Sequence, residues 1–243
     1  NKKLGSRVQC ICVAYEGMER FFPADKIVMT GNPIRSIIVP ATPEMKEAGI
    51  KEYGLDPSRK HIFIVGGSLG SARFNQCMKE WISDGCPGLD GVDVLWQCGK
   101  HYRPDIDRFM DEQRTKNPDV ARHIHHSDFI GRMELAYAAA DVVISRSGAS
   151  SVSELCAARK AVIFIPSPNV AEDHQTHNAM ALVKKDAAVV VKDAEAMEKM
   201  IPTALELLKD PARIATLEEN AGKMALPDAA GKIAEEVYKL IKG

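Results

Sequence analysis

Residues 144–158 read Ile-Ser-Arg-Ser-Gly-Ala-Ser-Ser-Val-Ser-Glu-Leu-Cys-Ala-Ala, and an apolar run from Val142 leads into them. The run predicts a buried strand that ends in a turn of small residues around Gly148. A helix is predicted to follow at once, with Ser151 as its N-cap and Glu154 as the capping-box partner. A strand that turns straight into a helix leaves free N–H groups and a positive dipole end at one spot, which favours phosphate. Because a carboxylate repels phosphate, Glu154 is predicted to accept hydrogen bonds from sugar hydroxyls, so the stretch predicts a nucleotide-diphosphate pocket.

Outside this stretch, short apolar runs alternate with helical patterns along most of the 243 residues. Strands are predicted at 8–14, 26–30, 61–65, 92–97, 123–126, 142–145, 162–166 and 187–191. Helices are predicted at 43–53, 71–83, 104–115, 132–139, 151–158, 172–185, 194–208, 211–225 and 228–241. Continuously apolar strands between helices predict an α/β fold with a buried parallel sheet and right-handed crossovers. Ligands of such sheets bind at the carboxyl ends of the strands. The stretch at 144–158 and the glycine-rich residues 66–71 both fall there.

Two further segments at that edge carry polar groups. Residues 66–71, Gly-Gly-Ser-Leu-Gly-Ser, follow a predicted strand, and Ser68 is a candidate phosphate donor. This loop is neither a dinucleotide fingerprint nor a P-loop, and a tight turn needs glycine whether or not a ligand binds. Gln175 and Asn178, three residues apart on a predicted helix, can read sugar hydroxyls, or form an ordinary polar helix start.

Other candidates have equally plain structural alternatives. Phe129 and Ile130 offer a ring and backbone groups to a planar base, although an apolar pair at a strand end is usually core. Arg35 is a candidate phosphate clamp or a surface ion-pair residue. His123 and His125 share one face of a predicted strand, but no spacing supplies a third zinc ligand, so no metal is expected.

Composition excludes several classes of function. The net charge is -1 and aromatic residues make up 6% of the chain, so no nucleic-acid partner is expected. No run is long enough for a membrane span and no signal peptide opens the sequence. The six cysteines form no CxxC pair, which favours a reduced, cytosolic compartment.

The organisation of the chain suggests a part of a larger protein. The sequence begins at Asn1 and its first methionine is Met18, so we expect a fragment. Three prolines at 31–43 predict a linker or hinge. No serine-nucleophile elbow, paired carboxylates or convincing general base stands out. The residues therefore predict a ligand-binding part of a larger protein, without catalytic groups of its own.

Four motifs together, in order and spacing, resemble the bacterial MurG family. They are Gly31-Asn-Pro-Ile-Arg35, Gly66-Gly-Ser-Leu-Gly70, Ser145-Arg-Ser-Gly-Ala-Ser-Ser-Val-Ser-Glu154, and His174-Gln175 with Asn178-Ala179. The resemblance implies the two-domain GT-B glycosyltransferase fold. Residues 1–34 would be the end of the N-terminal acceptor-binding domain with its linker, and 35–243 the C-terminal UDP-GlcNAc donor-binding domain, a Rossmann-like parallel sheet with helices on both faces.

The resemblance also implies an activity and a set of contacts. The family is an inverting hexosyltransferase that moves GlcNAc from UDP-GlcNAc to lipid I, forming lipid II for peptidoglycan, without metal or other cofactor. Catalytic residues, lipid I contact and peripheral contact with the cytoplasmic face of the bacterial inner membrane are expected in the N-terminal domain, so this chain alone is expected to be inactive. By resemblance, Glu154 holds ribose, Ser68 and Arg35 face the diphosphate, Ile130 beside Phe129 pairs with uracil, and Gln175 and Asn178 read GlcNAc. The helix start that faces the diphosphate comprises Ala149, Ser150, Ser151, Val152 and Ser153. His174 departs from the glutamine of some members.

Three alternatives compete with this interpretation. A non-catalytic nucleotide-sugar-binding subunit would need a separate acceptor-binding partner. A sugar-nucleotide epimerase would need further acid and base groups in the cleft. A nicotinamide-dependent oxidoreductase is disfavoured by the broken glycine fingerprint and the missing ribose acid about 20 residues beyond it.

Overall fold

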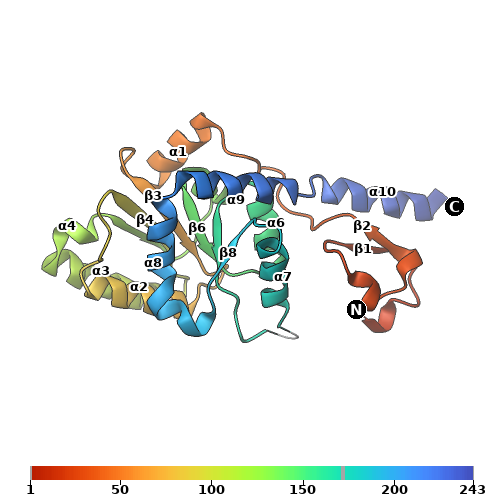
Figure 1. Cartoon of the computed structure of the whole chain (residues 1–243), viewed down its shortest axis with the longest axis horizontal. Helices are drawn as coiled ribbons and strands as arrows, with labels where there is room; N and C mark the ends of the chain where they lie inside the picture. The colour runs from red at the N-terminus through yellow and green to blue at the C-terminus, as the bar shows by residue number, and fades with distance from the viewer. Residues whose placement is uncertain (1, 171–172, 243) are drawn as a thin grey trace.

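A computed structural model describes residues 2–170 and 173–242, and its centre is a six-stranded sheet in the order β5-β4-β3-β6-β7-β8 (Figure 1). Every pair of neighbouring strands in it is parallel. The strands are β3 (Lys60–Val65), β4 (Val92–Gln97), β5 (Ile124–Ser127), β6 (Val142–Ser145), β7 (Val162–Phe164) and β8 (Val189–Val190). The predicted α/β fold with a parallel sheet is therefore confirmed.

Helices cover both faces of this sheet because its strands are apolar on both sides. Along β3, Ile62 and Ile64 belong to one core cluster and Phe63 and Val65 to the other, as the twofold alternation of a strand requires. The first cluster is closed by α2 (Ala72–Ser83), α3 (Arg103–Lys116) and α8 (Ala196–Leu208). The second is closed by α5 (Met133–Ala139), α6 (Ala149–Ala157) and α7 (His174–Val183). The remaining helices are α1 (Pro43–Tyr53), α4 (Pro118–Ala121), α9 (Pro211–Lys223) and α10 (Ala229–Lys242).

The predicted start of α6 is wrong by two residues. The helix begins at Ala149, and its N-cap is Gly148 in extended conformation (φ -62, ψ 150) with no side-chain capping bond. Ser151 is therefore the third helical residue, and Glu154 lies in the second turn instead of forming a capping box. Glycine is a common N-cap residue, so the helix can begin without a serine hydroxyl.

Residues 2–30 form a separate, smaller unit. Its strands β1 (Ile11–Val13) and β2 (Ile27–Met29) make a two-stranded parallel sheet, shorter than predicted. This unit also contains the short 3₁₀ helices Lys2–Leu4, Met18–Arg20 and Ala24–Lys26, and another, Asp193–Glu195, precedes α8. Residues 31–42 then lead to α1 without helix or strand.

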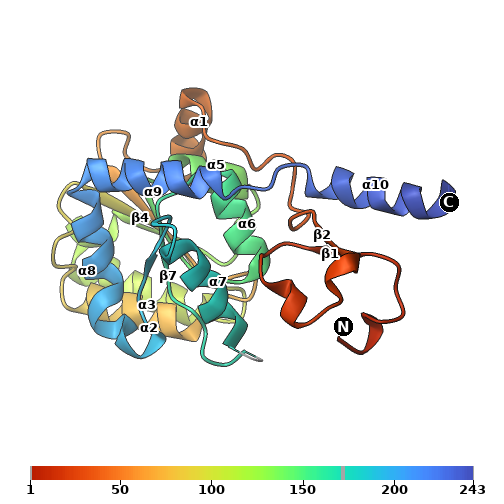
Figure 2. The ribbon, with the colours of Figure 1, turned by 45° about the vertical axis from the view of Figure 1, so that its right-hand side comes forward.

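The last helix, α10, extends away from the six-stranded sheet and lies beside this small unit (Figures 1 and 2). The Sγ of Cys10 lies 3.9 Å from a carboxylate oxygen of Glu236 on α10. The chain therefore passes from the small unit to the six-stranded sheet, and its last helix returns to the small unit. Within residues 2–170 and 173–242, no helix has the length and apolar character needed to cross a membrane.

Candidate functional site

A cavity of about 550 Å³ opens at the carboxyl ends of the central strands. Its walls come from the loops after β3, β6 and β7, together with the first residues of α2 and α6. The lining residues are Gly66, Gly67, Gly70, Ser71, Ala72, Arg73, Gln76, Arg146, Gly148, Ser151, Ser167, Pro168, Asn169, Gln175 and Asp193. The glycine-rich loop and the start of α6, which the sequence predicts to share one edge, thus meet at one cavity.

Two helices begin at this cavity and direct their amino ends toward it. In α2, Ser71 is the N-cap, and its Oγ accepts a hydrogen bond from the Phe74 amide at 3.3 Å. In α6, Gly148 is the N-cap and supplies no side chain. The first N–H groups of both helices and their positive dipole ends therefore favour an anion in the cavity.

The glycine-rich loop after β3 touches the loop after β4. Gly70 has φ +77, and a Cβ added there would lie 2.2 Å from the Cys98 carbonyl oxygen. Gly99 has φ +93, and its Cβ would lie 2.3 Å from the Leu69 carbonyl oxygen. Only glycine fits both the left-handed backbone and this close approach.

Replacing Gly70 by alanine is expected to displace the glycine-rich loop and lower the free energy of unfolding by about 1–3 kcal/mol, because both the backbone region and the new Cβ contact are unfavourable. Urea unfolding measures the loss. Gly91→Ala is the matched control for the backbone term, since Gly91 also has a positive φ (+69) but nothing lies within 4 Å of its added Cβ. Equal losses for the two variants would contradict the packing argument.

The cavity holds a charged network that sequence reasoning missed. The Arg146 guanidinium donates to Asp193 at 2.6 Å, to the Ile165 carbonyl at 2.9 Å and to the Ser71 hydroxyl at 3.0 Å. It also lies over the Phe74 ring, 4.6 Å from the centroid. Arg73 donates to the same Asp193 at 3.3 Å. Two arginines share one carboxylate here, which leaves the cavity with a surplus positive charge.

One signal for this network was available in the sequence. Arg146 follows a buried strand directly and lies within the stretch that predicts the anion site. Asp193 gave no such signal, because it lies 47 residues further along the chain.

The predicted residues of α6 have different surroundings. Ser151 lines the cavity, whereas Ser150 is exposed and Ala149 is half-buried. Val152 is buried in the core at 2% exposure, so only its backbone can face a ligand. The Ser153 hydroxyl accepts a hydrogen bond from Asn32 at 3.2 Å.

Glu154 lies in an ion pair outside the residues that line the cavity. Its Oε1 accepts from the Nε of Arg35 at 3.2 Å and from Nη2 at 3.1 Å, and its Oε2 accepts from the Tyr137 hydroxyl at 3.2 Å. Burial raises the pKa of Tyr137 well above its usual value, and the Glu154 carboxylate raises it further. The tyrosine therefore stays protonated and remains a donor to Glu154. Arg35 thus holds the predicted ribose acceptor rather than lining the cavity.

Gln175 and Asn178 organise the loops around the cavity. The Gln175 side-chain oxygen accepts from the Ser167 amide at 2.9 Å, and its carbonyl accepts from the Ser147 hydroxyl at 2.8 Å. Asn178 donates to the Ser147 carbonyl at 3.0 Å. Gln175 lines the cavity while Asn178 braces the loop after β6.

Ser68, Phe129 and Ile130 are not among the residues that line the cavity. Ser68 is exposed at the tip of the glycine-rich loop. Phe129, after β5, is 59% exposed, and Ile130 is 3% exposed. Gln97, which the sequence did not suggest, joins the two loops: its oxygen accepts from the Gly66 amide at 3.3 Å and its nitrogen donates to the Asp128 carbonyl at 3.1 Å.

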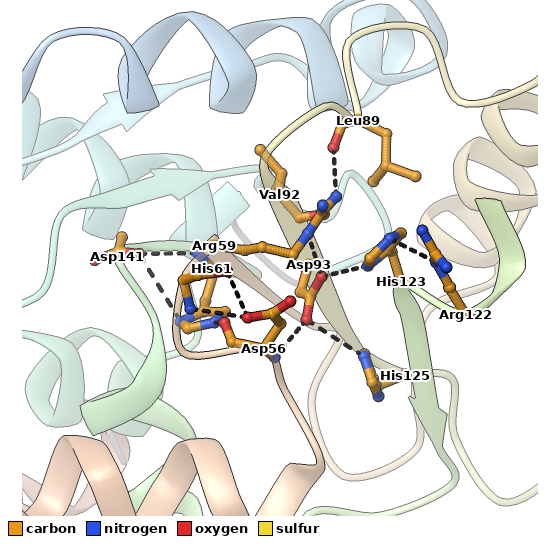
Figure 3. Close-up of polar contacts among 11 residues, drawn as sticks. Asp56, Arg59, His61, Leu89, Val92, Asp93, Arg122, His123, His125 and Asp141 are labelled. Carbon is orange, nitrogen blue, oxygen red and sulfur yellow. Dashed lines mark hydrogen bonds and ion pairs between the residues drawn. The ribbon is translucent and has the colours of Figure 1, made fainter. Parts of the chain in front are cut away.

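His123, just before β5, and His125, on β5, lie beside the buried Asp93 near the amino end of β4 (Figure 3). Nδ1 of His123 lies 2.8 Å from Asp93, Nε2 of His125 lies 3.6 Å from it, and the Nε of Arg59 lies 2.7 Å from it. The arginine charge makes this place unsuitable for a cation. Across residues 2–170 and 173–242, no group of three or more histidine, cysteine or carboxylate side chains has the geometry to hold a metal ion.

Comparisons with known proteins agree with these features. The profile of the glycosyltransferase family 28 C-terminal domain matches residues 61–233. The chain is 46% identical over 240 residues to the UDP-N-acetylglucosamine--N-acetylmuramyl-(pentapeptide) pyrophosphoryl-undecaprenol N-acetylglucosamine transferase of Bacteroides thetaiotaomicron, and 48% identical over 240 residues to that of Bacteroides fragilis. Each match covers 99% of this chain but 63% and 61% of the relative, so the chain spans less than two thirds of their length.

Solved structures show the same fold. Acinetobacter baumannii MurG superposes with a TM-score of 0.71 at 24% identity, covering 98% of this chain and 62% of that one. Anabaena HepE in complex with UDP-glucose gives a TM-score of 0.63 at 13% identity, with 97% and 65% coverage. The resemblance and the GT-B fold predicted from the four motifs are confirmed. The chain belongs to glycosyltransferase family 28, and its six-stranded unit is the C-terminal domain of that family.

Proposed function

We propose that this chain is the donor-binding part of an inverting transferase that moves GlcNAc from UDP-GlcNAc to lipid I, forming lipid II. The observation that carries the proposal is the cavity at which two helix amino ends and the Arg73–Arg146 pair meet. A diphosphate is the ligand that such donors favour. The names of the curated relatives state this same donor, acceptor and reaction for those proteins.

In the proposed complex, the diphosphate lies against the starts of α2 and α6, with Ser68 and Arg35 approaching it from the rim. Glu154 accepts from the ribose hydroxyls, Phe129 and Ile130 hold uracil, and Gln175 with Asn178 reads GlcNAc. The backbone donors stabilise the charge that develops on UDP as it leaves. The mechanism needs no metal, and we place the base and the acceptor site outside residues 35–243.

The proposed boundary at 34/35 places residues 1–34 with the acceptor-binding domain, which would also make peripheral contact with the cytoplasmic face of the inner membrane. The alternative, a separate binding subunit, is less well supported, because the matched relatives each continue beyond the shared region within one polypeptide.

Calorimetric titration of the chain tests the donor class. UDP-GlcNAc and UDP are expected to bind, with UDP-glucose weaker than UDP-GlcNAc. Absence of binding by either UDP or UDP-GlcNAc would contradict the proposal.

Replacing Glu154 by glutamine is expected to weaken UDP binding by roughly tenfold, because charge-assisted hydrogen bonds to ribose are lost. The preference for UDP over 2′-deoxy-UDP should shrink in this variant, since that preference reports the ribose contact itself. Both quantities come from calorimetry. Glu134→Gln is the matched control: Glu134 is also paired with an arginine, and its side chain is 12% exposed against 13% for Glu154. An unchanged UDP to 2′-deoxy-UDP ratio in Glu154→Gln would exclude Glu154 as the ribose acceptor.

A further inference from the structure

The cavity at the carboxyl ends of the strands, which we propose binds the donor, is called the donor cavity below. A second cavity, of about 480 Å³, lies at the opposite edge of the sheet. Its lining includes Lys60 at the start of β3, Asp141 just before β6 and Lys160 shortly before β7. These three strands are neighbours and parallel, so their amino ends meet at one edge. The starts of α1 and α9 close the cavity on its other sides.

Three lysines from three different elements line this cavity, together with two carboxylates. Lys46 comes from α1, Lys60 from β3 and Lys160 from the turn before β7. The carboxylates are Asp141 and Glu218. The lining therefore carries one positive charge more than it has negative charges.

The carboxylates leave much of the lysine donor capacity unused. One oxygen of Asp141 accepts from Lys46 at 2.8 Å. The other accepts from the His61 amide at 2.8 Å, and Figure 3 draws this second contact. Glu218 lies 3.5 Å from the Lys160 ammonium, which is long for an ion pair. An ammonium group has three N–H donors, so Lys160 can bind a further oxygen.

Lys160 is unusual because lysine is rarely buried without a close partner. Its side chain is 9% exposed. Burial lowers the pKa of its ammonium group; Glu218 and Asp141 oppose that effect, whereas Lys46 adds to it. An additional anion beside Lys160 would offset the burial of its charge.

The lining of this cavity also includes apolar side chains. They are Ala138, Ala140, Leu208, Ile214 and Ala215. A ligand that matches this lining has an anionic head for the lysines and a small apolar body.

We propose that this cavity is a second ligand site, which binds the phosphate group of a small organic phosphate. Lysine ammonium groups bind phosphate as point charges, and here three lysines from three elements line one cavity. The start of α1, where Thr42 and Pro43 line the cavity, adds a positive dipole end to the lining. The site is separate from the donor cavity and does not depend on the proposed transferase function.

Titration calorimetry with inorganic phosphate and phenyl phosphate tests the site. Phenyl phosphate is expected to bind more tightly than inorganic phosphate, because its ring contacts the apolar wall. All titrations are repeated in the Arg146→Met background, which alters only the donor cavity, so that phosphate bound there is distinguished from phosphate bound here.

Four variants give the expected pattern for phenyl phosphate. Lys160→Met, which keeps the apolar stem, weakens binding about tenfold, and Lys60→Gln, at an exposed position, weakens it about threefold. Glu218→Gln strengthens binding, an outcome that a purely structural ion pair with Lys160 does not give. Lys79→Met, an exposed lysine on α2, leaves binding unchanged. Equal affinity in native, Lys160→Met and Lys60→Gln proteins, or no binding of either probe by the native chain, would overturn the proposal.

Discussion

Replacing Asp93 by alanine is expected to lower the free energy of unfolding by about 3–5 kcal/mol, because it leaves the charge of Arg59, whose side chain is 16% exposed, without its partner. Asp93 is 1% exposed and lies 2.7 Å from the Nε of Arg59, whose Nη2 donates to the Leu89 and Val92 carbonyls. Its carboxylate also accepts from the Asp56 amide at 2.8 Å. Urea unfolding followed by tryptophan fluorescence measures the loss.

The same carboxylate gives stability a dependence on acid pH. Burial by itself raises the pKa of Asp93, but His125, the Asp56 amide and His123 outweigh it and lower the pKa from 3.8 to about 2. Because the folded pKa lies below the unfolded one, this contribution, about 2 kcal/mol, is complete above about pH 5 and is lost as the pH falls through 2. Asp93→Asn is expected to remove this part of the pH dependence.

Asp105→Ala is the control for both measurements, since Asp105 forms an exposed pair with Lys79 and its side chain is 63% exposed. Its loss is expected to stay within about 1 kcal/mol. A loss for Asp93→Ala no greater than for Asp105→Ala would show that the buried network adds nothing to stability.

Replacing Arg146 by methionine is expected to weaken UDP binding about 100-fold. Arginine has five N–H donors, and described residues of this protein accept from three of them. The remaining two lie on a group that lines the donor cavity, where charge-assisted bonds to phosphate are strong. The substitution also removes the hydrogen bonds by which Arg146 links Ser71, at the start of α2, to Asp193. The cavity therefore loses a positive charge and a contact that holds its walls in place.

Calorimetry with UDP measures the effect, and circular dichroism checks that the fold is retained. Arg213→Met is a matched control, because Arg213, on α9, pairs with Asp186 at 2.6 Å and is not among the residues that line the cavity. Arg146→Lys keeps the charge without the planar fork and should give an intermediate loss. If Arg146→Met binds UDP within threefold of the native chain, the guanidinium takes no part in holding the diphosphate.

Local signals predicted most elements of the fold closely. The strands at 92–97 and 142–145 and the helix at 43–53 have the predicted bounds. Continuous apolar runs define the strands, and Thr42, Pro43 and Gly54 define the helix through its N-cap, first position and left-handed C-cap. The edge strand at 189–190 and the strand at 11–13 are shorter than predicted, since an apolar run does not reveal where pairing with a neighbour stops.

The site was predicted less completely, because many of its contacts join residues that are far apart in the sequence. The glycine-rich loop and the start of α6 were recognised because each is a contiguous motif with a local backbone role. The Arg73–Asp193 pair spans 120 residues and the Arg35–Glu154 pair spans 119, so neither leaves a pattern in any window of sequence. The pairing of Glu154 with Arg35 and Tyr137 likewise depends on the packing of α6 against α5 and the segment before α1.

The amino-acid sequence alone determined that the chain alternates strands and helices around a parallel sheet. Strands buried on both faces and helix caps each depend on residues that are close together in the sequence. It also determined at which edge of the sheet the glycine-rich loop and the loop before α6 lie. Only the tertiary structure decided which charges share that edge, since Arg73, Arg146 and Asp193 come from three separate elements that folding brings together. A charge network is set by distances in space, and those depend on how the whole chain packs.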